Sequence, residues 1–127
     1  MLVFKKVDCV RIRVPDMDQA LTFYRDKLRL KLLWKKGTDE AGLKMADSDT
    51  EIVLVKEELE QPEIDLTVDS VENSIEIFEE AGGKVLVSPF EIAIGKCSVV
   101  EDPWKNKFVI LDNSKGLLKV DKNKNVI

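Results

Sequence analysis

The sequence predicts a single α+β domain of two βαβββ modules. Two segments of the 127-residue chain repeat one pattern at a constant offset. Val14 matches Val68 and Tyr24 matches Phe78, so both pairs lie 54 positions apart. Each copy starts like a strand, continues like a helix and is followed by three short strand-like runs. A repeat of this kind indicates duplication of one structural unit.

Each copy opens with alternating apolar residues, which is typical of a strand with one buried face. The apolar positions are Val10, Ile12 and Val14 in the first copy, and Ile64, Leu66 and Val68 in the second.

A helix start follows each strand. Asp16 with Gln19 resembles a capping box, and Ser70 is a favourable N-cap residue. Apolar residues then recur at helical spacing, and the second helix is expected to end at Gly82-Gly83. The spaced residues are Met17, Ala20, Leu21, Tyr24 and Leu28 in the first copy, and Val71, Ile75 and Phe78 in the second.

Three further strands are expected in each module. The runs are Leu30–Trp34, Gly42–Met45 and Glu51–Val55, then Lys84–Val87, Lys96–Glu101 and Lys107–Leu111. We therefore expect module one at about residues 4–60 and module two at about 61–114, joined near Gln61-Pro62. The tail at 115–127 is open to three interpretations: a terminal strand, a dimer contact or a partly disordered segment.

Composition restricts the chemistry. The chain has no histidine, which excludes histidine-based nucleophile activation, imidazole acid–base catalysis and histidine metal ligands. Its net charge is −4 and it has no basic stripe, so nucleic acid is not an expected partner. It has no apolar run of membrane-spanning length and no secretory pattern at its start, so we expect a cytoplasmic protein without a membrane partner. The two cysteines are expected to be reduced thiols.

Two motifs resemble the glyoxalase/bleomycin-resistance (vicinal oxygen chelate) superfamily. The stretch from Val7 through Pro15-Asp16 to Phe23-Tyr24, closing with Leu28-Arg29-Leu30, is similar to that family's first strand, helix and "FYxxxLGL" turn. Gly95 and the later Asp102-Pro103-Trp104-Lys105-Asn106 resemble its "DPDGN" turn. Arg29 and Lys105 stand where the family commonly has glycine, and Trp104 replaces an aspartate. The resemblance covers about residues 4 to 114. It implies a glyoxalase-like fold, often dimeric, in which the curved mixed sheets of two βαβββ modules surround a cavity.

The resemblance also implies where a metal would lie. Metal-dependent members bind the ion through His and Glu or Gln on central strands. The matching positions in this chain are Cys9, Glu63, Val109, and Val53 or Val55 or their neighbour Leu54. Only Cys9 and Glu63 have side chains able to ligate, which is fewer than the three or four protein ligands of a catalytic site. We therefore expect no metal and no other cofactor.

Strand alternation directs six side chains to the expected cavity, opposite the helix-facing residues. They are Cys9, Arg11, Arg13, Glu63, Asp65 and Thr67. In one interpretation Arg11 pairs with Asp65, and Arg13 with Glu63 or another acid, as a structural network. In the other, one guanidinium binds the carboxylate or phosphate of a ligand.

Trp34, Phe90 and Cys9 have two interpretations each. Trp34 and Phe90 are either walls on which a flat ligand stacks or ordinary packing residues. Cys9 is either a nucleophile activated by Arg11 or a buried thiol. Together with Val109, Trp34 and Phe90 complete the expected cavity lining.

Three functions fit these expectations. The first is a metal-independent protein, expected to be a homodimer, that binds a small organic molecule in the manner of bleomycin-resistance proteins. The second is a metal-dependent lyase, isomerase or dioxygenase of the same superfamily, with Glu63 or Asp65 as acid–base candidates. The third is an interaction module whose cavity is filled by its own side chains.

Overall fold

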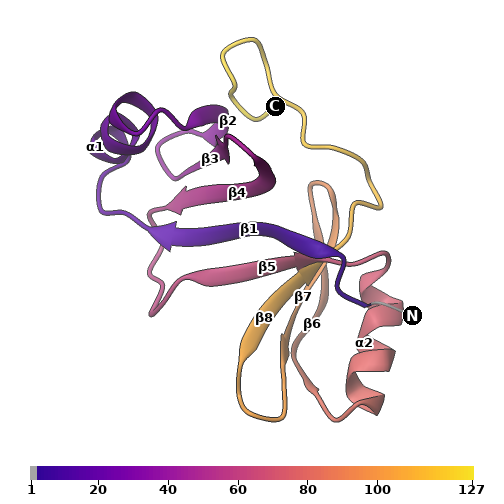
Figure 1. The fold of residues 1–127 in the computed structure, drawn as a ribbon. Coiled ribbons are helices and arrows are strands. Elements are labelled where there is room, and N and C mark those ends of the chain that lie inside the picture. The colour runs from indigo at the N-terminus through magenta and orange to yellow at the C-terminus, as the bar shows by residue number, and fades with distance from the viewer. Residues whose placement is uncertain (1–2) are drawn as a thin grey trace. The chain divides into compact units, whose positions relative to one another are not determined.

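A computed structural model describes residues 3–127, which fall into two compact units (Figure 1). The first-repeat unit consists of Asp8–Glu63 with Lys119–Ile127. The second-repeat unit consists of Ile64–Leu118 with residues 3–7. The two units divide between Glu63 and Ile64, and each terminal segment belongs to the unit of the other repeat. The module bounds expected from the sequence stay a prediction.

The first-repeat unit has the βαβββ order. Its elements are β1 (Lys6–Arg13), α1 (Met17–Leu21), η1 (Thr22–Lys27), β2 (Lys31–Lys36), β3 (Glu40–Met45) and β4 (Ser48–Val55). The strand order is β2-β3-β4-β1, with β1 parallel to β4 and the other neighbours antiparallel.

The second-repeat unit has the same order. Its elements are β5 (Glu63–Thr67), α2 (Val71–Glu80), β6 (Lys84–Ile92), β7 (Gly95–Glu101) and β8 (Lys107–Leu111). The strand order is β5-β8-β7-β6, and the first strand again lies parallel to the last. The predicted α+β fold class and duplicated βαβββ modules are confirmed.

The apolar faces of both repeats are mostly buried as the alternation predicted, but Ile64, at the start of β5, is 39% exposed. Val14 packs with Met17 and Leu21 in one core, and Leu66 packs with Val71 in the other. Burying each such aliphatic side chain stabilises the fold by about 1.5–3 kcal/mol. The helix-facing side of each sheet is therefore the main source of stability in its unit.

The first helix departs from the predicted spacing. Its cap is as expected, because the Asp16 carboxylate accepts a hydrogen bond from the Gln19 backbone N–H at 2.9 Å. The helix then widens into the π-helix η1, where the Leu28 N–H bonds to the Phe23 carbonyl five residues earlier. A π-helical turn rotates the residues that follow away from an α-helical face. The expectation that Leu28 belongs to the apolar face is wrong, since its side chain is 53% exposed.

The second helix matches its prediction. The Ser70 hydroxyl accepts a hydrogen bond from the Asn73 N–H at 3.3 Å. The helix ends at Glu80, and Gly82 follows with a φ of 107°. This positive φ favours glycine, which explains why the helix stops at the Gly82-Gly83 pair.

Two positions where the superfamily commonly has glycine keep a left-handed backbone. Arg29 has a φ of 68° and Lys105 a φ of 70°. Around Lys105, the Asp102 carboxylate accepts hydrogen bonds from the backbone N–H groups of Trp104 and Asn106, each at 2.8 Å. These bonds hold the turn in a backbone conformation that a side chain makes less favourable.

The C-terminal tail forms a second turn of the same kind. Asp121 accepts backbone hydrogen bonds from Asn123 and Asn125, and Lys124 has a φ of 69°. This turn brings the tail onto β2: the Lys35 N–H donates to the Lys124 carbonyl at 2.8 Å, and the Lys35 carbonyl accepts from the Val126 N–H at 3.0 Å. Of the three interpretations of the tail, the structure favours the strand-like one.

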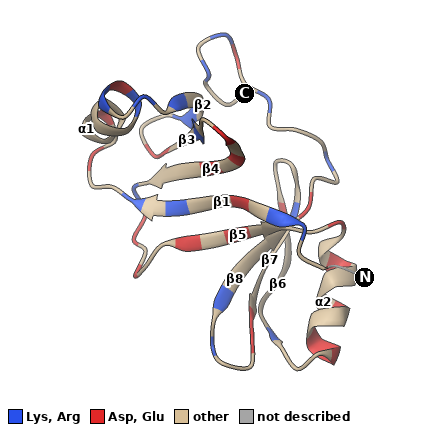
Figure 2. Cartoon of the chain, viewed as in Figure 1, with Lys and Arg blue, Asp and Glu red and all other residues tan. Residues whose placement is uncertain are grey.

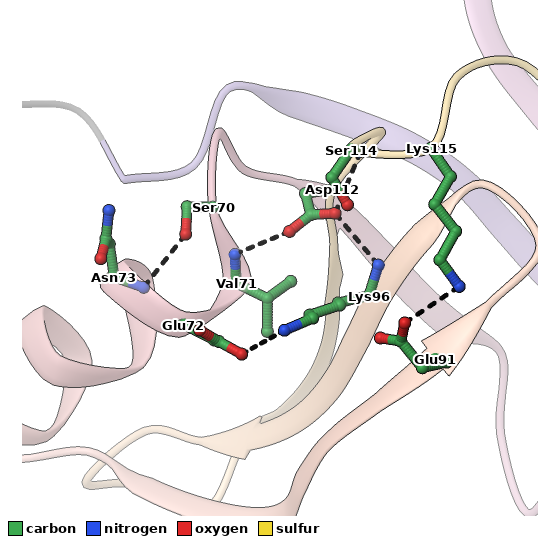
Figure 3. A network of polar contacts seen from close by, with 9 residues as sticks. All are labelled: Ser70, Val71, Glu72, Asn73, Glu91, Lys96, Asp112, Ser114 and Lys115. Atoms are coloured by element: carbon green, nitrogen blue, oxygen red, sulfur yellow. Dashed lines mark hydrogen bonds and ion pairs between the residues drawn. The ribbon is translucent and has the colours of Figure 1, made fainter.

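One buried carboxylate connects three segments of the second-repeat unit (Figure 3). Asp112 follows β8 and is 4% exposed. It accepts backbone hydrogen bonds from Val71 at 3.0 Å, Lys96 at 3.0 Å and Ser114 at 3.2 Å. The start of α2, the start of β7 and the segment after β8 are therefore held by one side chain.

Among the described helices, none has the length and apolar character needed to cross a membrane.

Candidate functional site

The candidate site lies on the face of the first-repeat sheet that is directed away from α1. Cys9 from β1 packs there with Val53 and Val55 from β4, and all three are buried. Trp34 from β2 and Leu59 from the β4–β5 connection pack against this cluster. We call Cys9, Val53, Val55 and Trp34 the Cys9 face, and Leu59 lies against it. The buried-thiol interpretation of Cys9 agrees with this apolar packing.

A hydrogen bond to Glu51 fixes the indole of Trp34. Its Nε1–H donates to the Glu51 carboxylate at 2.7 Å. Glu51 is the β4 residue in register with Cys9, so its side chain belongs to the same side of the sheet. Gly42 on β3 makes this contact possible, because a Cβ there would overlap both the indole and the carboxylate. Trp34 is half-buried, and it serves as packing and as a hydrogen-bond donor at once.

Arg11 is the central charge of the site. Its side chain is 18% exposed, and its guanidinium contacts three glutamates from three different elements. The contacts are Nη2 to Glu40 at 2.5 Å, Nη2 to Glu57 at 3.0 Å and Nε to Glu63 at 3.3 Å. Burial alone would lower the pKa of Arg11, but the hydrogen bonds that its guanidinium donates to Glu40 and Glu57 outweigh this effect and raise the pKa. Arg11 is therefore a permanent cation.

Arg13, two residues further along β1, is more exposed and makes a weaker contact. Its Nη2 lies 3.2 Å from the Glu58 carboxylate, and the two side chains are 40% and 87% exposed. Of the expected pairings, the one with another acid is the one seen for Arg13. Arg11 pairs with the three glutamates described above, and its expected pairing with Asp65 stays a prediction.

A cleft of about 610 Å³ opens beside Arg11. Its walls carry charges of both signs, and Val55 contributes an apolar surface. The lining residues are Arg11, Lys36, Asp39, Glu40, Val55, Lys56 and Glu57. A second cleft, of about 480 Å³, lies in the second-repeat unit, where Lys5 forms an ion pair with Asp69 at 2.7 Å. We base the site on the first cleft, because it joins a half-buried cation to an apolar surface.

The remaining expected lining residues belong to the second-repeat unit. Asp65 and Thr67 are buried on β5, and Val109 on β8 is in register with Asp65. Phe90, on β6, is 43% exposed. That these residues line one cavity with Cys9 and Arg11 stays a prediction.

Sequence reasoning missed Glu40, Glu51 and Glu57. Glu40 lies 29 residues from Arg11 and Glu57 lies 46 residues from it, so no local pattern connects them. The one available signal was the acidic segment that follows β4, where Glu57 and Glu58 stand next to the joint between modules. Their pairing with two arginines two residues apart on a strand follows from same-face alternation.

Comparison with protein-family models settles the family. The model of the Glyoxalase/Bleomycin resistance protein/Dioxygenase superfamily matches residues 6–110, which is most of the chain. The chain belongs to this superfamily. The match includes both βαβββ repeats and ends within β8, in agreement with the resemblance inferred from the motifs.

Solved structures with the superfamily fold match over nearly the whole chain. A hypothetical protein from Bacillus halodurans C-125 has a TM-score of 0.73 at 20% identity, covering 90% of this chain and 98% of its own. Methylmalonyl-CoA epimerase from Mycobacterium tuberculosis has a TM-score of 0.73 at 18% identity, covering 90% and 93%. A variant of methylmalonyl-CoA epimerase from Streptomyces coelicolor has a TM-score of 0.69 at 15% identity, covering 87% and 99%. No curated protein matches the chain. At these identities the structures establish the fold alone.

The donor set at the superfamily's metal positions does not fit a metal ion. Val53 and Val109 have hydrocarbon side chains, and the Glu63 carboxylate lies against the Arg11 guanidinium. Cys9 packs among valines. In residues 3–127, no three or more histidine, cysteine, aspartate or glutamate side chains converge in an arrangement suited to a metal. A soft thiolate and one ion-paired carboxylate do not supply the three or four ligands that a catalytic site uses.

Proposed function

We propose that this protein binds a small organic anion at Arg11, without a metal. One observation carries the proposal: a permanently charged guanidinium, 18% exposed, lies in a cleft of about 610 Å³ next to the apolar Cys9 face. Guanidinium groups bind carboxylates and phosphates through paired, directional hydrogen bonds. The surrounding strands also hold the cation in place, which reduces the entropic cost of fixing its side chain on binding.

In this proposal the Arg11 guanidinium supplies the positive charge that a metal ion supplies in metal-dependent members of the superfamily. Arg11 is bound by Glu63, the β5 residue at a metal position, and it is in register with Val53, the β4 residue at another. A ligand oxygen that would coordinate a metal ion in a metal-dependent member would accept hydrogen bonds from Arg11 instead. Acetate and inorganic phosphate are suitable first probes, because they contain the anionic group and little else.

Two variants of Arg11 test the proposal. Arg11→Met removes the cation and keeps most of the side-chain volume, while Arg11→Lys keeps the charge and loses the planar fork. Isothermal titration calorimetry should show anion binding that is abolished in Arg11→Met and weakened in Arg11→Lys. Thermal unfolding of each variant monitors the fold. Equal anion affinity in wild type and Arg11→Met would refute binding at Arg11.

Metal independence needs its own measurement. We expect protein purified without chelators to contain no stoichiometric transition metal by elemental analysis, and anion binding to be unchanged after dialysis against EDTA. Stoichiometric Zn, Ni or Fe that is lost in a Cys9→Ser variant would favour the metal-dependent enzyme instead.

A second candidate is an interaction module with a filled cavity, and one observation favours it. Leu59 of the β4–β5 connection already packs on the Cys9 face, where a ligand would lie. This candidate predicts that no small anion stabilises the protein in a thermal-shift screen.

For the assembly, we propose a cytoplasmic homodimer that does not bind nucleic acid. Support for a dimer comes from β6, where Leu86, Val87 and Phe90 are 43%, 44% and 43% exposed. Support against nucleic acid comes from the mixture of acidic and basic residues along the strands (Figure 2). Multi-angle light scattering would measure the assembly, and a monomeric mass would contradict the dimer.

A further inference from the structure

The connection between β4 and β5 folds back over the candidate site. Three consecutive residues of this connection, Glu57, Glu58 and Leu59, each contact that side of the first-repeat sheet. Glu57 contacts Arg11, and Glu58 contacts Arg13. Leu59 packs against the cluster of Cys9, Val53 and Val55. We call residues 56–62 the β4–β5 strap.

The carboxylates around Arg11 are of two kinds. Glu40 and Glu63 are 24% and 31% exposed and lie on strands β3 and β5. Glu57 is 61% exposed, and Glu58 at Arg13 is 87% exposed. Ion pairs between exposed side chains are weak and are screened by salt. The strand carboxylates are therefore fixed parts of the site, and the strap carboxylates are exchangeable.

The strap contributes the same chemistry that a ligand would. Glu57 places a carboxylate on Arg11, and Leu59, two residues later, places a branched aliphatic group on the Cys9 face. A ligand that displaced them would exchange one carboxylate for another, so the charge around the guanidinium would not change. It would also cover the same apolar surface, so little hydrophobic burial would be lost.

We propose that the β4–β5 strap is a lid that occupies the binding site as an internal mimic of the ligand. The inference rests on the proposed anion-binding function and narrows its ligand class. The ligand is a monocarboxylate with a branched aliphatic or aromatic body, whose anion replaces Glu57 at Arg11 and whose body replaces Leu59. Binding requires the strap to open, so the apparent affinity equals the intrinsic affinity reduced by the open fraction.

Trp34 provides a direct report of this exchange. It packs on the same cluster as Leu59, whereas the other tryptophan, Trp104, is 79% exposed in the turn after β7. A Trp104→Phe background leaves Trp34 as the single tryptophan of the chain. The probe is 4-methylpentanoate, which joins a carboxylate to a leucine-like body. Its controls are 4-methylpentan-1-ol, which lacks the charge, and acetate, which lacks the body.

The strap variant is Glu57→Gln/Glu58→Gln, which removes both ion pairs of the strap. Its matched control is Glu60→Gln/Glu76→Gln, which removes the same charge from two exposed residues without an ion pair in the described part of the chain. We expect the strap variant to bind 4-methylpentanoate roughly twofold to tenfold more tightly than the background protein, the gain expected from losing two exposed ion pairs. The control variant should bind like the background.

Leu59→Ala gives a second test that does not depend on charge. It should also bind the probe more tightly, and the Trp34 emission of the probe-free variant should shift to longer wavelength as the indole becomes more exposed. Thermal unfolding of each variant confirms that it is folded before titration.

The outcomes separate the two proposals. Probe binding that is tighter in both strap variants, with weaker binding of the alcohol and of acetate, supports the lid. Equal affinity in background, strap and control variants overturns the lid while leaving anion binding intact. Absence of probe binding from every folded variant, together with absence of acetate and phosphate binding, overturns the proposed function itself.

Discussion

Replacing Asp112 with asparagine removes a buried negative charge and changes little in volume. The two oxygens of Asp112 accept backbone hydrogen bonds from the starts of α2 and β7 and from Ser114 (Figure 3). In Asp112→Asn, one oxygen remains for Lys96 and Ser114. The new amide NH₂ group faces the Val71 N–H. Both groups are donors, so the hydrogen bond that the carboxylate accepted from Val71 is lost.

The expected loss of stability follows from these contacts. Hydrogen bonds to a charged group contribute about 1.5–3 kcal/mol each, and an unsatisfied buried N–H costs a similar amount. Asp112→Asn loses the bond to Val71 and weakens the two others by removing the charge. We therefore expect the free energy of unfolding to fall by about 2–3 kcal/mol at pH 7.

The effect should depend on pH in a defined direction. Burial raises the pKa of Asp112, but hydrogen bonds from Val71, Ser114 and Lys96 outweigh it and lower the pKa below its ordinary value. A carboxyl with a lowered folded-state pKa stabilises the fold above its unfolded pKa of about 3.9 and loses this contribution as the pH falls through the folded-state pKa. The difference in the free energy of unfolding between wild type and Asp112→Asn should therefore be largest at pH 7 and become smaller in acid.

Urea unfolding at pH 7, 5, 4 and 3 measures this difference. Asp69→Asn is the control, because that carboxylate is 81% exposed and its one ion pair, with Lys5, is a surface pair. The control should change stability by less than about 1 kcal/mol. The reasoning is refuted if Asp112→Asn is as stable as the control variant at pH 7, or if its deficit stays constant down to pH 3.

Three further changes test the fold. Lys105→Gly should raise the free energy of unfolding by about 1 kcal/mol, because it relieves a left-handed φ of 70°, and an unchanged or lower value in urea would contradict this. Gly95→Ala should lower stability by about 1–3 kcal/mol, since the new Cβ would overlap the carbonyl and carboxylate oxygens of Asp112; a neutral effect on the melting temperature would count against that packing. Truncation after Leu118 should remove the backbone partners of Lys35 and leave the edge of β2 open. Light scattering should then show more self-association than in the full chain, because an open strand edge can pair with another molecule. An identical mass distribution would argue against edge protection by the tail.

The offset of 54 between Val14 and Val68 predicted the duplicated module because identical strand–helix patterns bury their apolar faces in the same way. Asp16 and Ser70 predicted where the helices begin, because capping depends on a side chain and an N–H three residues away. The first helix was less predictable beyond Leu21. There a π-helical turn replaced the α-helical spacing and turned Leu28 outward.

The site was predicted in part. Alternation along β1 correctly separated Cys9 and Arg11 from the helix-facing Ile12 and Val14. It could not name the partners of Arg11, because an ion pair depends on which charged groups the fold brings within about 4 Å, and Coulomb attraction does not depend on sequence separation. Glu40 and Glu57, which the sequence analysis did not consider as partners, reach the guanidinium from the start of β3 and from the β4–β5 strap.

By itself, the sequence determined the two modules, their strand faces, their helix starts and the absence of histidine chemistry. The strand faces and helix starts depend on residues a few positions apart, where the sequence spacing fixes the direction in which each side chain points. Tertiary structure alone decided that Arg11 holds three glutamates, that Leu59 covers the Cys9 face and that the tail pairs with β2. Those contacts join segments that are distant in the chain, and only the packing of the strands brings their atoms together.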